Sequence, residues 1–215
     1  MADLEERANV VASGSRWNGS GAGVRRRRPA DLADCVRVLA DVHAVDGYPA
    51  DWPERPAAWL TPDGLLAAWV AEAEGRITGH IGLARSAPGD AAPGLWGLRT
   101  GGRPELTAVI GRLYVAPTAR GHGTGAHLLA RAVVHARALG LHPVLDVLST
   151  DTAAVALYRR LGWTLLGSGE QRWASGRTVL VHCFAAPRAE PSRPAERSGA
   201  AEPFRAAEPS RAAER

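Results

Sequence analysis

The sequence of 215 residues contains no lysine, only two cysteines and no long apolar segment. Two cysteines, Cys35 and Cys183, cannot build a disulfide framework or a four-cysteine zinc site, so we expect two buried free thiols. The longest apolar run, 65–71, is far short of the roughly 20 residues that cross a bilayer. The acidic start of the chain has no apolar block behind it, which argues against a secretory signal. These absences predict a cytoplasmic protein with no membrane partner.

The charge is mildly positive, and all 26 basic residues are arginine. A formal net charge of +4 favours a small polyanionic ligand, but no stripe interleaves arginine with aromatic residues as in many nucleic-acid sites. The one dense run, 25–28, is predicted to be a short edge strand, whose alternating faces would scatter its charges. We therefore expect no nucleic-acid partner, and steeply salt-dependent binding to nucleic acid would reverse this view.

The chain divides into three parts. In 187–215 an Ala-Glu pair recurs every six residues, and Phe204 is the only large apolar residue. Such a segment cannot bury enough surface to offset its chain entropy, so we predict a disordered tail. Residues 1–22 are also weakly patterned and are predicted to be a flexible N-terminal segment. The folded domain is expected at 23–186.

Hydrophobic periodicity within 23–186 alternates between strand and helix patterns. Strands are predicted at 24–28, 67–73, 76–85, 105–115, 143–148, 163–166 and 177–185. Helices are predicted from Pro29 to about Val42, around 57–60, at 123–139 and at 152–161, and the Gly/Pro-rich stretch 87–104 is interpreted as a long loop. The pattern predicts an α/β fold, with a mixed sheet of about seven strands flanked by about four helices.

A glycine-rich turn, Arg-Gly-His-Gly-Thr-Gly at 120–125, joins a predicted strand to the longest predicted helix. Glycines let the backbone approach a ligand closely, and the N–H groups and dipole at a helix N-terminus attract phosphate. Arg120 can add a charge-assisted contact. The spacing fits neither a Walker loop nor the dinucleotide fingerprint. Taken alone, the turn is equally explained as an ordinary entry into a helix.

A second pattern follows about thirty residues later and comprises Asp151, Ala154, Leu157, Tyr158, Gly162 and Trp163. Together with Leu-Tyr-Val-Ala-Pro at 113–117 and the spacing of Arg120, Gly123 and Gly125, it resembles the GNAT superfamily of acyl-CoA-dependent N-acetyltransferases. The resemblance covers nearly all of 24–185. It is specific for the fold and the cosubstrate, and says little about the acceptor.

The resemblance implies a mixed, mostly antiparallel sheet whose fourth and fifth strands splay apart to admit acetyl-CoA, with no metal. Pantetheine is expected along the strand edge at Leu113, Tyr114 and Val115. The residues expected at the pyrophosphate are Arg120, Gly121, His122, Gly123, Thr124, Gly125 and Ala126. Asp151 stands where the family often has Asn, and it is expected either to contact the cofactor or simply to cap the helix that follows.

The chemistry requires that a neutral amine attack a thioester and that a thiolate leave. Tyr158 is the candidate acid for that thiolate, and a backbone N–H near Tyr114 or Val115 is the candidate for stabilising the oxyanion. Without the family pattern, Tyr158 would be interpreted as a packing residue. Many relatives carry a glutamate on the fourth strand that relays the amine proton. Val109 occupies that position here, and Glu105 lies four residues too early, so the general base is left open.

The acceptor site is expected in the loop after the first helix, with His43, Asp46, Tyr48 and Trp52, near Asp51. Acids and aromatics together favour a cation, although an ordinary polar loop explains them equally well. His43 is one candidate base. The sequence thus predicts an N-acetyltransferase for the primary amine of a small molecule or of a peptide N-terminus. A non-catalytic acyl-CoA sensor is the alternative, and a homodimer is left open.

Overall fold

The computed structural model describes residues 23–87, 90–172 and 176–188. The predicted flexible segment 1–22 lies outside this range, as does the predicted disordered tail apart from its first two residues. The domain boundaries therefore stay predictions. Within the described part of the chain, no helix is long and apolar enough to cross a membrane.

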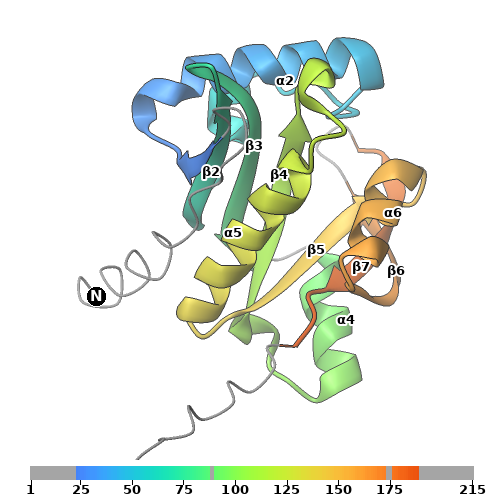
Figure 1. The fold of residues 1–215 in the computed structure, drawn as a ribbon. Helices are drawn as coiled ribbons and strands as arrows, with labels where there is room; N and C mark the ends of the chain where they lie inside the picture. Colours follow the sequence, from blue (N-terminus) through green and yellow to red (C-terminus); the bar gives the residue numbers. More distant parts are fainter. Residues whose placement is uncertain (1–22, 88–89, 173–175, 189–215) are drawn as a thin grey trace, which may run out of the picture.

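Seven strands form one sheet in the order β1-β2-β3-β4-β5-β7-β6. Their bounds are β1 Gly23–Arg26, β2 Leu65–Ala73, β3 Arg76–Arg85, β4 Thr107–Val115, β5 His142–Leu148, β6 Thr164–Arg172 and β7 Thr178–Ala185. Neighbouring strands are antiparallel except for β4 and β5, which run parallel near the middle of the sheet (Figure 1). The predicted mixed, mostly antiparallel sheet is confirmed.

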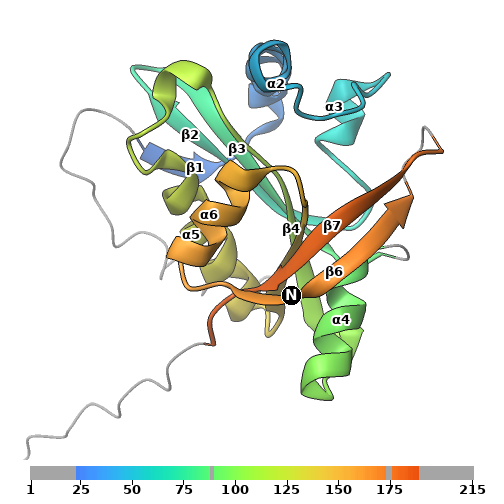
Figure 2. The same cartoon turned by 90° about the vertical axis from the view of Figure 1, so that its right-hand side faces the viewer.

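Helices cover both faces of the sheet (Figure 2). They are α2 Leu32–Asp46, α3 Pro56–Trp59, α4 Ala91–Thr100, α5 Thr124–Ala138 and α6 Thr152–Arg160, with 3-10 turns η1 Pro29–Asp31, η2 Pro104–Leu106 and η3 Pro117–Ala119. Helices α5 and α6 pack on one face. On the other face, α2 and α3 cover the β2–β4 half, and α4 covers the β5–β7 half.

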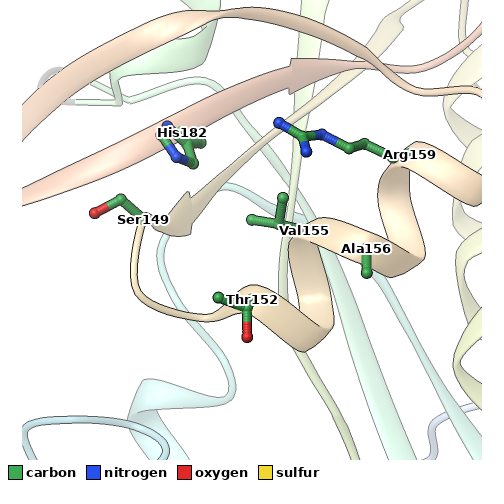
Figure 3. Close-up of a pocket in the computed structure, with 6 residues that line it drawn as sticks. All are labelled: Ser149, Thr152, Val155, Ala156, Arg159 and His182. Carbon is green, nitrogen blue, oxygen red and sulfur yellow. The ribbon is translucent and has the colours of Figure 1, made fainter.

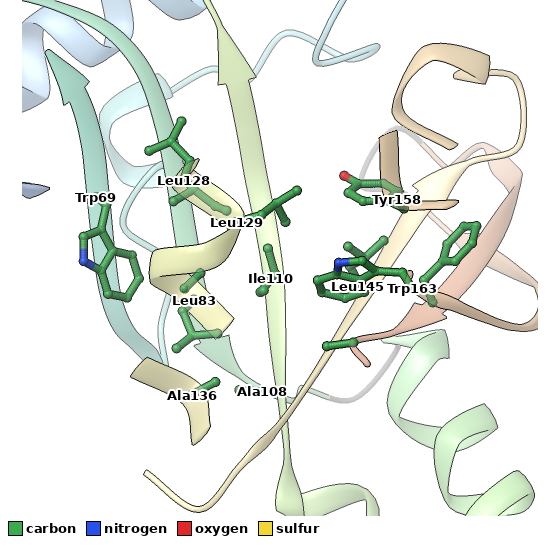
Figure 4. Packing of buried hydrophobic residues seen from close by; sticks show 14 of the residues in the cluster. Trp69, Leu83, Ala108, Ile110, Leu128, Leu129, Ala136, Leu145, Tyr158 and Trp163 are labelled. Atoms are coloured by element: carbon green, nitrogen blue, oxygen red, sulfur yellow. The ribbon is translucent and has the colours of Figure 1, made fainter. Parts of the chain in front are cut away.

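The apolar face of α5 is its core face. Leu128, Leu129, Ala132 and Ala136 recur at helical spacing along α5 and are buried. They pack against the side chains of β2, β3 and β4, among them Ile110 (Figure 4). This packing fixes α5 over the sheet, and so it also fixes the glycine-rich turn that precedes α5.

The prediction of a loop at 87–104 is wrong, because this stretch contains α4. Pro93 lies in the first turn of α4, where its missing N–H costs no hydrogen bond. The first turn is also capped from outside, since the Asp146 carboxylate on β5 accepts the N–H of Ala91 at 3.2 Å and that of Ala92 at 2.9 Å. A long-range cap of this kind leaves no local sequence signal.

A β-bulge interrupts the pairing of β4 with β3 between Gly111 and Tyr114. Arg112 adopts a left-handed φ of 55° within it. Before the bulge, Ala108 and Ile110 face α5, whereas after it Tyr114 and Ala116 face α2. The bulge has therefore inverted the alternation of side chains along β4.

Candidate active site

Strands β4 and β5 pair at only three positions, Thr107 with His142, Ala108 with Pro143 and Val109 with Val144. Beyond them the two strands diverge, which Figure 1 shows near the centre of the molecule. The rest of β4, from Ile110 to Val115, lacks a partner strand on the β5 side. The predicted splay is confirmed, and it leaves a strand edge open beside Leu113 and Val115.

The turn from β4 into α5 presents a run of unpaired backbone N–H groups. The first amide hydrogen bond of α5 runs from the N–H of His127 to the carbonyl of Gly123 at 3.1 Å. Within the described ranges, the N–H groups of the six preceding residues, 121–126, have no acceptor. Gly121 and Gly123 have φ of +83° and +77°, a conformation that other residues adopt only with strain. Six free donors at a helix N-terminus fit a polyanion such as a diphosphate.

Arg120 lies beside this turn and is held by Asp46. Both terminal nitrogens of Arg120 donate to the Asp46 carboxylate, one at 3.1 Å, and its Nε donates to the carbonyl of Val115 at 3.2 Å. Asp46 ends α2 and was expected in the acceptor site. The structure pairs it with Arg120 beside the glycine-rich turn, and its place in an acceptor site stays a prediction.

Tyr158 on α6 is only 6% exposed, and its ring packs against Trp163 and Phe184 with centroid distances of 5.9 and 5.7 Å. Its hydroxyl has no hydrogen-bond partner among the described residues. Every fully buried side-chain oxygen of those residues does have a partner, so the Tyr158 hydroxyl is not fully buried. The hydroxyl therefore reaches open space, and in Figure 4 it points from α6 toward β4. Burial raises the pKa of Tyr158, as does the charge of Asp151, so the hydroxyl keeps its proton at neutral pH and is able to donate it.

Asp151 acts as the N-cap of α6. Its Oδ1 accepts the N–H of Ala154 at 2.9 Å. The capping role expected for Asp151 is therefore confirmed, and a contact of Asp151 with the cofactor stays a prediction.

The predicted acceptor loop folds over its own aromatic side chains. His43 donates from Nδ1 to the carbonyl of Pro49 at 2.9 Å, and its ring lies 5.0 Å from that of Trp52. Tyr48 meets Trp59 of α3 edge-on at 6.2 Å. Since Nδ1 of His43 holds the loop together, only its Nε2 is left for acid-base chemistry.

Sequence reasoning missed Arg112 and Asp90. The guanidinium of Arg112 covers the Trp59 ring at 5.0 Å. Burial raises the pKa of Asp90, and the hydrogen bond from the Ala87 N–H and the charge of Arg112 oppose this rise. The bulge turns Arg112 toward the face of the sheet that α2, α3 and α4 cover. The sequence did contain one indication of Arg112, a single charged residue between the apolar residues Ile110 and Leu113 of a predicted strand. Val109 stands where many relatives carry a glutamate that relays the amine proton, and it packs in the apolar cluster under α4.

A pocket of about 480 Å³ lies between α6 and β7 (Figure 3). Its lining residues are Ser149, Thr152, Val155, Ala156, Arg159 and His182, and none of them was a predicted site residue. The described ranges hold no group of three or more metal-ligating side chains.

Comparisons with known proteins agree with this geometry. The model of the acetyltransferase (GNAT) family matches residues 35–163. An L-methionine sulfoximine/L-methionine sulfone acetyltransferase from Pseudomonas paraeruginosa is 32% identical, over 81% of this chain and 98% of that protein.

Solved structures of acetyltransferases have a similar fold. One from Salmonella typhimurium, determined with its cofactor acetyl-CoA, has a TM-score of 0.57 and 24% identity over 81% of this chain and 98% of that one. A ribosomal-protein-alanine N-acetyltransferase from Brucella melitensis has a TM-score of 0.57 and 25% identity over 76% and 98%.

Proposed function

Because the chain belongs to the GNAT family of acetyltransferases, which use acetyl-CoA, we propose that it acetylates the primary amine of a small amino-acid derivative, with Tyr158 as general acid. The unpaired N–H groups at 121–126 carry the proposal on the cofactor side, since they offer a cradle for the diphosphate. The free hydroxyl of Tyr158 carries it on the chemical side.

A small-molecule acceptor is favoured over a protein N-terminus. The Pseudomonas paraeruginosa relative is matched over nearly its whole length, and both substrates in its name are α-amino-acid derivatives. The ribosomal-protein enzyme is less similar to this chain.

The residues perform the transfer as follows. The amide donors of the turn and Arg120 hold the diphosphate, and the open edge of β4 aligns the pantetheine beside Leu113 and Val115. A backbone N–H near Tyr114 or Val115 stabilises the charge that develops on the thioester oxygen. The amine nitrogen bonds to the acetyl carbon, the C–S bond breaks, and Tyr158 gives its proton to the departing thiolate. The amine proton passes to water, from which Tyr158 is reprotonated.

The test is an assay of free thiol with acetyl-CoA and a panel of primary amines. We expect thiol release that depends on an amino-acid acceptor such as L-methionine sulfone, with the acetylated product seen by mass spectrometry. The alternative, a non-catalytic acyl-CoA sensor, predicts binding of acetyl-CoA without amine-dependent release.

Tyr158→Phe tests the acid role. The loss of a general acid lowers turnover by about 100-fold or more. Because the hydroxyl has no hydrogen-bond partner in the described fold, the variant keeps the melting temperature and the acetyl-CoA affinity of the parent. Equal losses of turnover and cofactor affinity would contradict an acid role.

A further inference from the structure

Arg112 forms no ion pair within the described fold, although the Asp90 carboxylate lies within electrostatic reach of it. Its side chain is half-buried, and burial lowers its pKa. Its Nε donates to the carbonyl of Trp59, and no carboxylate of the described residues lies within ion-pair distance of it. By contrast, the half-buried Arg25 contacts both Asp31 and Glu72. Burying an unpaired charge is costly, so an anion that reaches Arg112 gains a strong interaction.

The open edge of this guanidinium is accessible. Its two terminal nitrogens have no acceptor among the described residues. Every fully buried side-chain nitrogen of those residues does have a partner, so these two nitrogens are not fully buried. Both nitrogens are therefore reached by solvent. Meanwhile the contact of Nε with the Trp59 carbonyl and the stacking on the Trp59 ring hold the guanidinium in one orientation. A fixed fork of two free donors matches the two oxygens of a carboxylate.

Arg112 lies beside the predicted acceptor loop, because its guanidinium covers the Trp59 ring at 5.0 Å and Trp59 meets Tyr48 edge-on at 6.2 Å. Burial raises the pKa of Tyr48, the charge of Arg112 opposes this rise, and the charge of Asp151 adds to it. The pKa of Tyr158 is raised first by burial and then by Tyr48 and Asp151. Tyr48 therefore lies within electrostatic reach of Arg112 on one side and of Tyr158 on the other. A molecule bound at Arg112 therefore lies beside the predicted acceptor loop.

We propose, on the basis of the function proposed above, that the terminal nitrogens of Arg112 bind the carboxylate of the acceptor in a bidentate contact. The acceptor is then an amine that carries a carboxylate beside it, as α-amino acids do. This differs from the cation site expected from the aromatic and acidic residues of the loop, because the selected charge is negative and the residue that selects it belongs to the sheet. Arg112 is a specificity-determining residue here and takes no part in proton transfer.

The experiment compares L-methionine sulfone with its methyl ester, which keeps the same α-amine and removes the negative charge. For the parent protein we expect kcat/KM to be about tenfold to a hundredfold higher for the free acid. In Arg112→Gln the preference is lost, because the free acid falls to the level of the ester while the ester changes little. Arg99→Gln, an exposed arginine on α4, is the matched control and keeps the parent preference.

Calorimetry with acetyl-CoA accompanies the kinetics, and Arg112→Gln is expected to keep the parent affinity. The proposal is overturned if the parent uses ester and acid equally, or if Arg112→Gln lowers both to the same extent, as a purely structural residue would. These results differ from a failure of the proposed function, in which the parent releases no thiol with any amine.

Discussion

The buried histidine beneath the bulge makes the stability of the fold depend on pH. His80 on β3 is fully buried and stacks on Tyr114 at 5.4 Å. Its Nε2 lies 3.1 Å from Nη1 of Arg27, and its Nδ1 lies 3.0 Å from the carbonyl of Arg112. A guanidinium only donates, so Nε2 accepts, and Nδ1 carries the proton that it donates to the bulge. The neutral ring thus satisfies a carbonyl that the bulge removed from the ladder.

The magnitude follows from the pKa. Burial lowers the pKa of His80 from 6.5 to about 4, and the cations Arg27 and Arg112 add to this effect, although the hydrogen bond to the Arg112 carbonyl opposes it. Between these two values the unfolded chain binds a proton that the folded chain does not bind. Stability is therefore complete above 6.5 and falls as the pH falls toward 4. The loss is about 2 kcal/mol at about pH 5 and about 3 kcal/mol once both states are protonated.

The assay is urea unfolding followed by tryptophan fluorescence across this pH range. The variant His80→Gln keeps a donor and an acceptor but does not titrate, so we expect its unfolding free energy to change much less than that of the parent. His122→Gln, at an exposed histidine, should retain the parent slope. If His80→Gln and the parent lose stability in parallel between 6.5 and about pH 5, the reasoning is refuted.

Three substitutions test other parts of the fold and site. Gly123→Ala places a side chain at a φ of +77°, which lowers the unfolding free energy by about 1–2 kcal/mol and weakens acetyl-CoA binding, measured by calorimetry, about tenfold. Its control is Gly94→Ala, which has open space around it in α4 and leaves the binding unchanged. Asp151→Ala removes the cap of α6 and lowers the unfolding free energy by about 1 kcal/mol. Asp151→Asn keeps a capping oxygen and changes the unfolding free energy by only about 0.3 kcal/mol, so equal losses in the two variants would contradict the capping role. Asp146→Ala removes both acceptors from the first turn of α4 and costs about 2 kcal/mol, with faster hydrogen exchange in α4; unchanged exchange there would contradict the long-range cap.

The features that local sequence determines were predictable. Strand alternation, the apolar face of α5 and the glycines that require left-handed φ are each encoded within a few residues, so the sheet, the long helix and the turn at 120–125 could be located in advance. The splay of β4 from β5 followed from the family resemblance, and the pairing confirms it.

The features that depend on distant residues were not predictable in the same way. Helix α4 looks like a loop because of Pro93 and its glycines, and its cap comes from Asp146 more than fifty residues later. Arg112 looks like an ordinary strand residue until the bulge turns it toward Trp59. The ion pair of Asp46 with Arg120 joins residues 74 positions apart, so no local pattern indicated it.

The account depends most on the amides between β4 and α5, and one titration tests them directly. Calorimetry of the folded protein compares acetyl-CoA with acetyl-pantetheine, which lacks the diphosphate. We expect micromolar affinity for acetyl-CoA and affinity at least about a hundredfold weaker for acetyl-pantetheine, since the six unpaired N–H groups act only on the diphosphate. Equal affinity for the two compounds, or no heat with acetyl-CoA at millimolar concentration, would contradict the account.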